Sequence, residues 1–210
     1  MMRAYALDSQ SGTHAPEAWG IIKTVIQAAK SKSTPLEEIY FYAQDLARAN
    51  GPLEQGKEVS TWDAWFDGIG KFSPRLKYGT GMIGFAATSH LEAFSKFLNA
   101  FDAAVPDASD RRVEYVKTLK NLVEAGNLLE AAMFFEGARE KGVEFDAHGY
   151  CIMIQGLATS SVEGKDALIL GLVERAKNNG FKGRGTVLNS LKASYGSGSS
   201  QVVDAYASLL

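Results

Sequence analysis

One glycine-rich motif in this sequence has the spacing of a phosphate-binding loop. Residues 79–84 read Gly-Thr-Gly-Met-Ile-Gly, a G-x-G-x-x-G pattern. In a dinucleotide site such glycines allow a tight turn and let the backbone approach a pyrophosphate at the start of a helix. The preceding residues 73–77 do not have the composition of a buried strand. A dinucleotide-binding enzyme is therefore one interpretation, and a junction where helices pack closely is the alternative.

The residues that bind metals or act as nucleophiles are few and scattered. His14, His90 and His148 share no metal-ligand spacing, and Cys151 is the only cysteine. Because Cys151 follows Tyr150 on an expected packing helix, we expect it to be a small buried hydrophobic residue. The sequence thus predicts no catalytic residue, no metal site and no cofactor.

The composition is that of an ordinary globular protein. The chain has 210 residues, of which 46% are hydrophobic and 22% charged, and its formal net charge is −2. Proteins that bind nucleic acid through its phosphates are usually basic, and this one is not. No apolar run reaches the length needed to cross a membrane, so no membrane insertion is expected.

Helix-start and helix-stop signals alternate along the chain, whereas strand signals are few. Three segments read as helix starts: Thr34–Glu37, Asn127–Glu130 and Ser160–Glu163. Three glycines read as stops, because glycine readily takes the left-handed conformation that ends a helix: Gly51, Gly142 and Gly180.

These signals predict a chain made of helices joined by short links. The expected helices span 16–31, 35–50, 60–72, 90–104, 110–124, 127–141, 147–158, 163–179, 185–194 and 200–209, and the stretch 75–88 is ambiguous. Short links make consecutive helices antiparallel neighbours. We therefore expect the all-α class, with stacked antiparallel helix pairs forming an α-solenoid.

An internal repeat supports this expectation. An aromatic residue followed by two aliphatic residues at i+4 and i+7 lines one helix face, and it recurs after 35 residues. The two sets are Tyr115, Leu119, Leu122 and Tyr150, Ile154, Leu157. Related sets lie upstream: Trp62, Phe66, Ile69 and, more weakly, Tyr78, Met82, Phe85.

The second helix of each expected pair has its own repeated feature. An alanine stands four residues before the terminal glycine in 47–51, 138–142 and 176–180. Ala131 and Phe135 lie on the same face as Ala138, which gives a small–large–small stripe suited to helix packing.

The segment 112–146 resembles a pentatricopeptide repeat (PPR), with Tyr115, Leu119, Phe135, Gly142 and the closing Asp146 where that family expects such types. The segment 147–184 is a looser match, which keeps the residues Tyr150, Ile154, Leu157, Ala167 and Gly180. The resemblance implies a single helical-repeat domain over 1–210, with degenerate flanking repeats at 16–52, 59–107 and 185–210.

PPR proteins commonly bind single-stranded RNA in organelles, one base per repeat. The base-reading positions, carried over from the family, are Asp63, Val116, Asp146, Cys151 and Arg184. Asparagine, threonine or serine is expected after the first-helix tyrosine, and Val116 and Cys151 stand there instead. The resemblance implies RNA binding as the default, but these departures from the family pattern and the balanced charge disfavour it here.

Short members of the family that lack base readers serve as accessory subunits. The resemblance thus implies a non-catalytic scaffold that binds protein subunits of a large complex in the mitochondrial matrix, foremost the F1 part of ATP synthase. The alternatives are an RNA-binding PPR protein, a mitochondrial ribosomal protein and, from the glycine motif, a dinucleotide-binding enzyme. No small-molecule substrate is expected for the scaffold.

Overall fold

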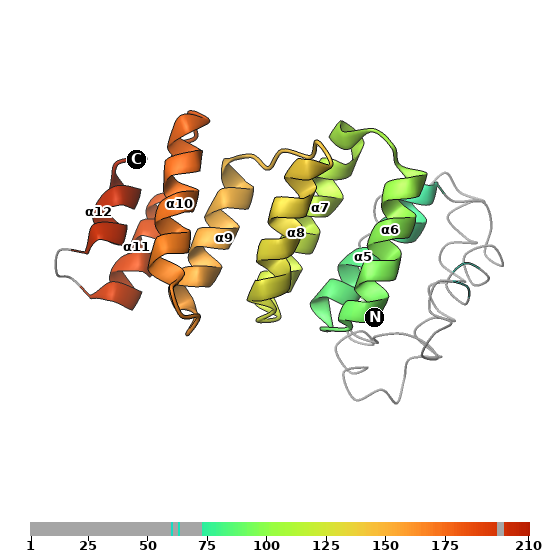
Figure 1. The fold of residues 1–210 in the computed structure, drawn as a ribbon, viewed down its shortest axis with the longest axis horizontal. Helices are drawn as coiled ribbons and strands as arrows, with labels where there is room; N and C mark the ends of the chain where they lie inside the picture. Colours follow the sequence, from blue (N-terminus) through green and yellow to red (C-terminus); the bar gives the residue numbers. More distant parts are fainter. Residues whose placement is uncertain (1–59, 61–62, 64–72, 197–199) are drawn as a thin grey trace, which may run out of the picture. The chain divides into compact units, whose positions relative to one another are not determined.

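The computed structural model describes residues 60, 63, 73–196 and 200–210, and all elements in this part of the chain are helical (Figure 1). The helices are α5 (Pro74–Ala87), α6 (Leu91–Ala104), α7 (Ala108–Glu124), α8 (Leu128–Glu140), α9 (Ala147–Thr159), α10 (Lys165–Asn178), α11 (Gly185–Tyr195) and α12 (Gln201–Ala207). The all-α class is confirmed for these residues. The helices predicted over 16–31 and 35–50, and nearly all of 60–72, lie outside them.

Most helix boundaries predicted after residue 89 agree with the structure within about two residues, as expected from local start and stop signals. The ambiguous stretch 75–88 is helix α5, which Ser73 caps by accepting a hydrogen bond from the Leu76 amide at 3.2 Å.

The helix start predicted at Ser160 was wrong. Ser160 instead ends α9, where its hydroxyl donates to the Leu157 carbonyl at 2.8 Å. Helix α10 begins only at Lys165, because Gly164 precedes it with a φ of 72° that redirects the chain.

The chain divides into two compact units, Met1–Glu114 and Tyr115–Leu210, and the boundary falls inside α7. In the first unit α5 packs against α6. The contact is close because two glycines of α5, Gly79 and Gly81, face the rings of Phe101 and Phe97. A Cβ atom at residue 81 would lie 2.4 Å from the Phe97 ring, so α5 needs glycine there.

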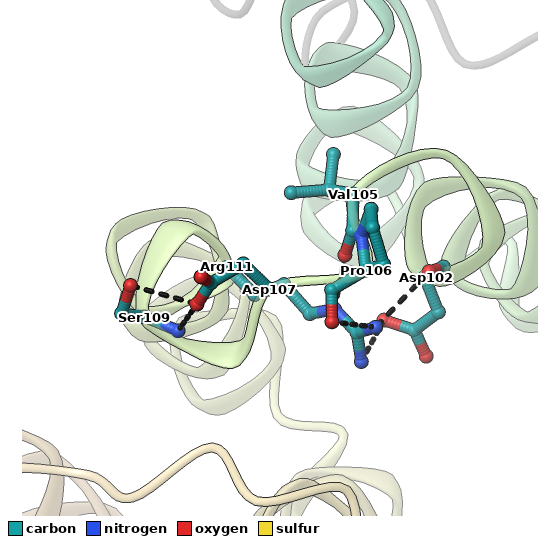
Figure 2. A network of polar contacts seen from close by, with 6 residues as sticks. All are labelled: Asp102, Val105, Pro106, Asp107, Ser109 and Arg111. Atoms are coloured by element: carbon teal, nitrogen blue, oxygen red, sulfur yellow. Dashed lines mark hydrogen bonds and ion pairs between the residues drawn. The ribbon is translucent and has the colours of Figure 1, made fainter.

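A buried arginine in the first unit fixes the turn that follows α6 (Figure 2). The Arg111 guanidinium donates to the backbone carbonyls of Val105, Asp102 and Pro106, and it lies 3.5 Å from the Asp102 carboxylate. The three carbonyls lie in the last turn of α6 or just after it, where backbone acceptors have no following helical turn, so Arg111 acts as a C-terminal cap for α6.

In the second unit α9 packs against α8, α10 and α11, and α12 packs against α10 and α11. A continuous series of ring contacts runs through this unit at centroid separations of 4.7 to 6.3 Å. Its members are Tyr115, Phe134, Phe145, Phe135, Tyr150 and Phe181. The rings join α7, α8 and α9 and the segments that follow α8 and α10 into one core.

Three helices of the second unit end in the same way. Gly126, Gly142 and Gly180 have φ values of 80°, 74° and 68°. At each, the glycine amide donates to the carbonyl three residues back and the next amide to the carbonyl five residues back. This is the Schellman motif, so the stops predicted at Gly142 and Gly180 are confirmed. The stop predicted at Gly51 lies outside the described residues.

The two best-matched aromatic–aliphatic sets, on α7 and α9, are buried, whereas the set Trp62, Phe66, Ile69 lies outside the described residues. Tyr115, Leu119 and Leu122 are at most 1% exposed, and their counterparts on α9 at most 7%. Ala167, however, does not take the place of Ala131: it is exposed, and Ile169 is fully buried instead. The glycine that ends each helix sets the register. Ala131 lies eleven positions before Gly142, and Ile169 lies eleven positions before Gly180.

Candidate functional site: a groove between α7 and α9

Among the five positions that the PPR resemblance assigns to base reading, two hold charged side chains that already have partners. Asp63 forms an ion pair with Lys77, with 2.9 Å between the Lys77 Nζ and an Asp63 carboxylate oxygen. Asp146 caps α9 by accepting from the amides of His148 and Gly149 at 3.0 and 3.2 Å. At each position the carboxylate therefore has a structural role in the chain itself.

The structure brings two further positions together around one hydroxyl. The Cys151 Sγ lies 3.5 Å from the hydroxyl oxygen of Tyr206, and the same oxygen accepts from the Arg184 amide at 2.9 Å. Burial raises the pKa of the Tyr206 hydroxyl. Cys151 is 5% exposed, which confirms the predicted burial, and Arg184 is exposed. The fifth position, Val116, is half-buried on α7.

The glycine motif at 79–84 lies in the interior of α5, where all six residues are buried. A phosphate-binding turn must come before a helix so that free backbone amides point at the ligand. Here the amides belong to the interior of the helix. The geometry corresponds to the alternative interpretation, a close contact between helices.

The two histidines in the described part of the chain, His90 and His148, belong to no group of potential metal ligands there. His90 precedes α6, and its Nδ1 lies 2.9 Å from the Thr88 hydroxyl oxygen. His148 is in the second unit, and His14 lies outside the described residues. Within those residues no group of three or more potential ligands surrounds a common point.

The second unit contains a groove of about 930 Å³, and none of the five positions assigned to base reading lines it. It is formed by the exposed face of α7, the turn into α8, helix α9 and the link that follows α9. Its lining residues are Lys120, Val123, Glu124, Gly126, Asn127, Leu128, Leu129, Glu130, His148, Ile152, Gln155, Gly156, Thr159, Ser160, Ser161 and Val162.

A close helix contact and a lysine anchor fix the walls of this groove. At Gly156 of α9, an added Cβ would lie 2.5 Å from a methyl carbon of Val123, so glycine lets α9 approach α7. The Lys165 ammonium donates to the carbonyls of Ala158 and Ser160 at 3.1 and 2.7 Å. These bonds hold the link after α9 in place.

Apolar side chains reach solvent at the groove. Leu129 is 69% exposed and Val162 39%, and Met133, one turn beyond Leu129 on α8, is 68% exposed. Single exposed apolar residues are common on protein surfaces. Here, however, Leu129 and Met133 are neighbours at i and i+4, so they form one apolar strip that begins at the groove.

The charges of the groove largely cancel and leave an excess of acid. Lys120 pairs with Glu124 across one helical turn, at 3.5 Å. Glu130 makes no hydrogen bond or ion pair with any described residue. The Nδ1 atom of His148 is buried and has no hydrogen-bond partner in the described part of the chain. The groove therefore offers apolar contacts and one unneutralised carboxylate.

Sequence reasoning missed this groove, although one signal for it was present. Leu129 and Met133 are apolar residues on the predicted helix 127–141, but they fall outside the stripe of Ala131, Phe135 and Ala138. An apolar pair off the packing face of an amphipathic helix indicates a second contact surface.

None of the described helices combines the length and the apolar character needed to cross a membrane. Comparisons of the chain with protein-family models, with curated proteins and with solved structures find no match.

Proposed function

We propose that this chain is a non-catalytic helical-repeat scaffold of PPR type that binds a partner protein within a larger mitochondrial assembly. The observation that carries the proposal is the groove of the second unit, with Leu129 and Val162 exposed at its edge. An exposed apolar surface beside polar residues is typical of protein-binding sites.

The packing of the second unit supports stacked helix pairs. Helix α9 contacts α10 and α11, and α12 contacts α10 and α11. In a stack, each helix contacts its own partner and the equivalent helix of the next pair. The recurring Schellman turns at Gly142 and Gly180 also favour a repeated unit. We infer from this pattern that α7–α8, α9–α10 and α11–α12 are successive pairs of a solenoid.

The charge of the chain favours a protein partner over RNA. The net charge is −2, and the Lys120 ammonium that lines the groove is paired with Glu124. RNA binding draws its affinity mainly from unpaired lysine and arginine side chains. Mitochondrial location, and the F1 part of ATP synthase as the leading assembly, rest on the resemblance of 112–184 to PPR units. A mitochondrial ribosome is the alternative assembly.

Native purification of the tagged full-length chain from its source cells, with and without ribonuclease, tests the proposal. We expect one defined multi-subunit complex, recovered in the same amount after ribonuclease treatment, and mass spectrometry then identifies its subunits. Release of the partners by ribonuclease would contradict the scaffold and favour an RNA-binding protein.

A further inference from the structure

We propose that the groove between α7 and α9 binds a segment of the partner protein that carries an apolar anchor residue next to a lysine or arginine. The inference rests on the proposed function in that the occupant is taken to be protein. It goes further by stating which surface is used and what chemistry the partner segment has.

Two apolar side chains that line the groove are exposed to solvent. Leu129 leaves 69% of its surface in solvent and Val162 leaves 39%, and both line the same hollow. Burying apolar area is the main favourable term in protein association. Ile152 and Val123 continue the apolar lining. A partner side chain seated among these residues would remove all four from water.

The charge that remains unpaired at the groove favours a basic residue in the partner. The groove is lined by three charged residues, Lys120, Glu124 and Glu130, of which the first two pair with each other. Glu130, beside Leu129, has no partner among the described residues. Glu163, next to Val162, is exposed and also has no partner in the described part of the chain. The charge left unpaired is therefore negative, and a lysine or arginine of the partner would neutralise it.

The same charges argue against a nucleic acid as the occupant. A phosphate backbone would meet the unpaired carboxylates of Glu130 and Glu163, while the basic side chain of the groove, Lys120, already contacts Glu124. Like charges brought together in a binding site reduce affinity.

The test uses a display library of random twelve-residue peptides, selected on the full-length chain. The selected peptides are synthesised, and their affinities are measured by fluorescence anisotropy. Two groove variants, Leu129→Gln and Glu130→Gln, are compared with matched controls on α10, Leu168→Gln and Glu174→Gln. Leu168 is 49% exposed, Glu174 is exposed, and neither lines the groove.

We expect the selected peptides to combine an aliphatic or aromatic residue with a lysine or arginine. Leu129→Gln should weaken binding by about 10-fold or more, as for an anchor contact. Glu130→Gln should weaken it by about 2- to 5-fold, as for an exposed ion pair. The α10 variants should stay within about 2-fold of the unmodified chain. Because all four positions are on the surface, circular dichroism should show unchanged folding.

Several results would overturn the inference: selection of acidic peptides, no selectable peptide, or affinities that Leu129→Gln leaves unchanged. Binding of a labelled oligouridine strand that becomes tighter in Glu130→Gln would instead identify a nucleic-acid site. If native purification still recovers a ribonuclease-resistant complex when Leu129→Gln is present, the groove assignment fails while the scaffold function stands.

Discussion

Arg111 shows how one buried charged side chain can hold a turn between two helices. Its guanidinium donates to three backbone carbonyls at the end of α6, and its charge lies close to the Asp102 carboxylate. Asp107 stabilises the other end of the same turn by accepting from the hydroxyl and the amide of Ser109, both at 2.8 Å. These two hydrogen bonds hold the pKa of Asp107 below its ordinary value.

We predict that Arg111→Met lowers the free energy of unfolding by about 3 kcal/mol, because it removes a buried guanidinium that donates to three backbone carbonyls and pairs with Asp102. Arg112→Met is the matched control at an exposed position, where a change below about 1 kcal/mol is expected. Urea denaturation of both variants measures the difference. Equal stability of the two variants would rule out the capping role of Arg111.

Tyr195 gives the second unit a pH-dependent contact. Its hydroxyl donates to the Asp166 carboxylate at 2.6 Å. Burial and then this hydrogen bond raise the pKa of Tyr195 from 10.0 to about 12. A raised pKa means that the folded chain holds the proton more tightly than the unfolded chain does. The stabilisation is therefore complete below pH 10 and is lost as the pH rises to about 12.

We predict that Tyr195→Phe loses less stability than the unmodified chain between pH 10 and 12, because it has no proton to release there. Denaturant midpoints at several pH values measure this slope, and phenolate absorbance shows one late-ionising tyrosine disappearing in the variant. Identical slopes for the two proteins would mean that the contact with Asp166 does not form in solution.

At the scale of the helices, the position of a glycine decides its effect. Helix-interior glycine costs about 1 kcal/mol relative to alanine. Gly81 of α5 permits the contact with Phe97, whereas a Cβ atom at Gly137 of α8 would meet no atom within 4 Å. The first glycine is required by packing, and the second is not required by any described residue of the chain.

We predict opposite effects for the same substitution at these two glycines. Gly81→Ala should destabilise the chain by about 1–3 kcal/mol through overpacking against Phe97. Gly137→Ala should stabilise it by about 0.5–1 kcal/mol through helix propensity. Thermal unfolding followed by circular dichroism compares them. Stabilisation by Gly81→Ala would show that α5 and α6 are not in close contact.

At the scale of the whole molecule, the balance of charge bears most on function. With 22 basic and 24 acidic residues, the chain has no general electrostatic attraction for a polyanion. This is why we expect ribonuclease to leave the native complex intact. In our proposal the groove is the surface at which apolar contact, rather than phosphate neutralisation, supplies the affinity for the partner.

Much of the fold could be predicted from the sequence because the signals are local. A helix needs a hydrophobic period of 3.6 residues and a residue that ends it, and both lie within a few positions of each other. The buried faces of α7 and α9 and the turns at Gly142 and Gly180 followed from such signals. The position of α10 did not follow from such signals. Its register is set by the glycine that ends it, Gly180, and not by Ser160, which precedes it.

The candidate site could not be predicted in the same way, because exposure depends on neighbours that are distant in sequence. The motif at 79–84 reads as a loop when taken alone, and the rings of Phe97 and Phe101 make it a helix contact. The PPR resemblance assigns Cys151 to base reading. In the structure, however, Cys151 lies in the interior and contacts Tyr206, which is distant in sequence. The sequence by itself determined most of the helices and the faces that α7 and α9 bury. Only the tertiary structure decided that Leu129 and Val162 remain exposed around one groove, because that depends on how α9 packs against α7 and α8.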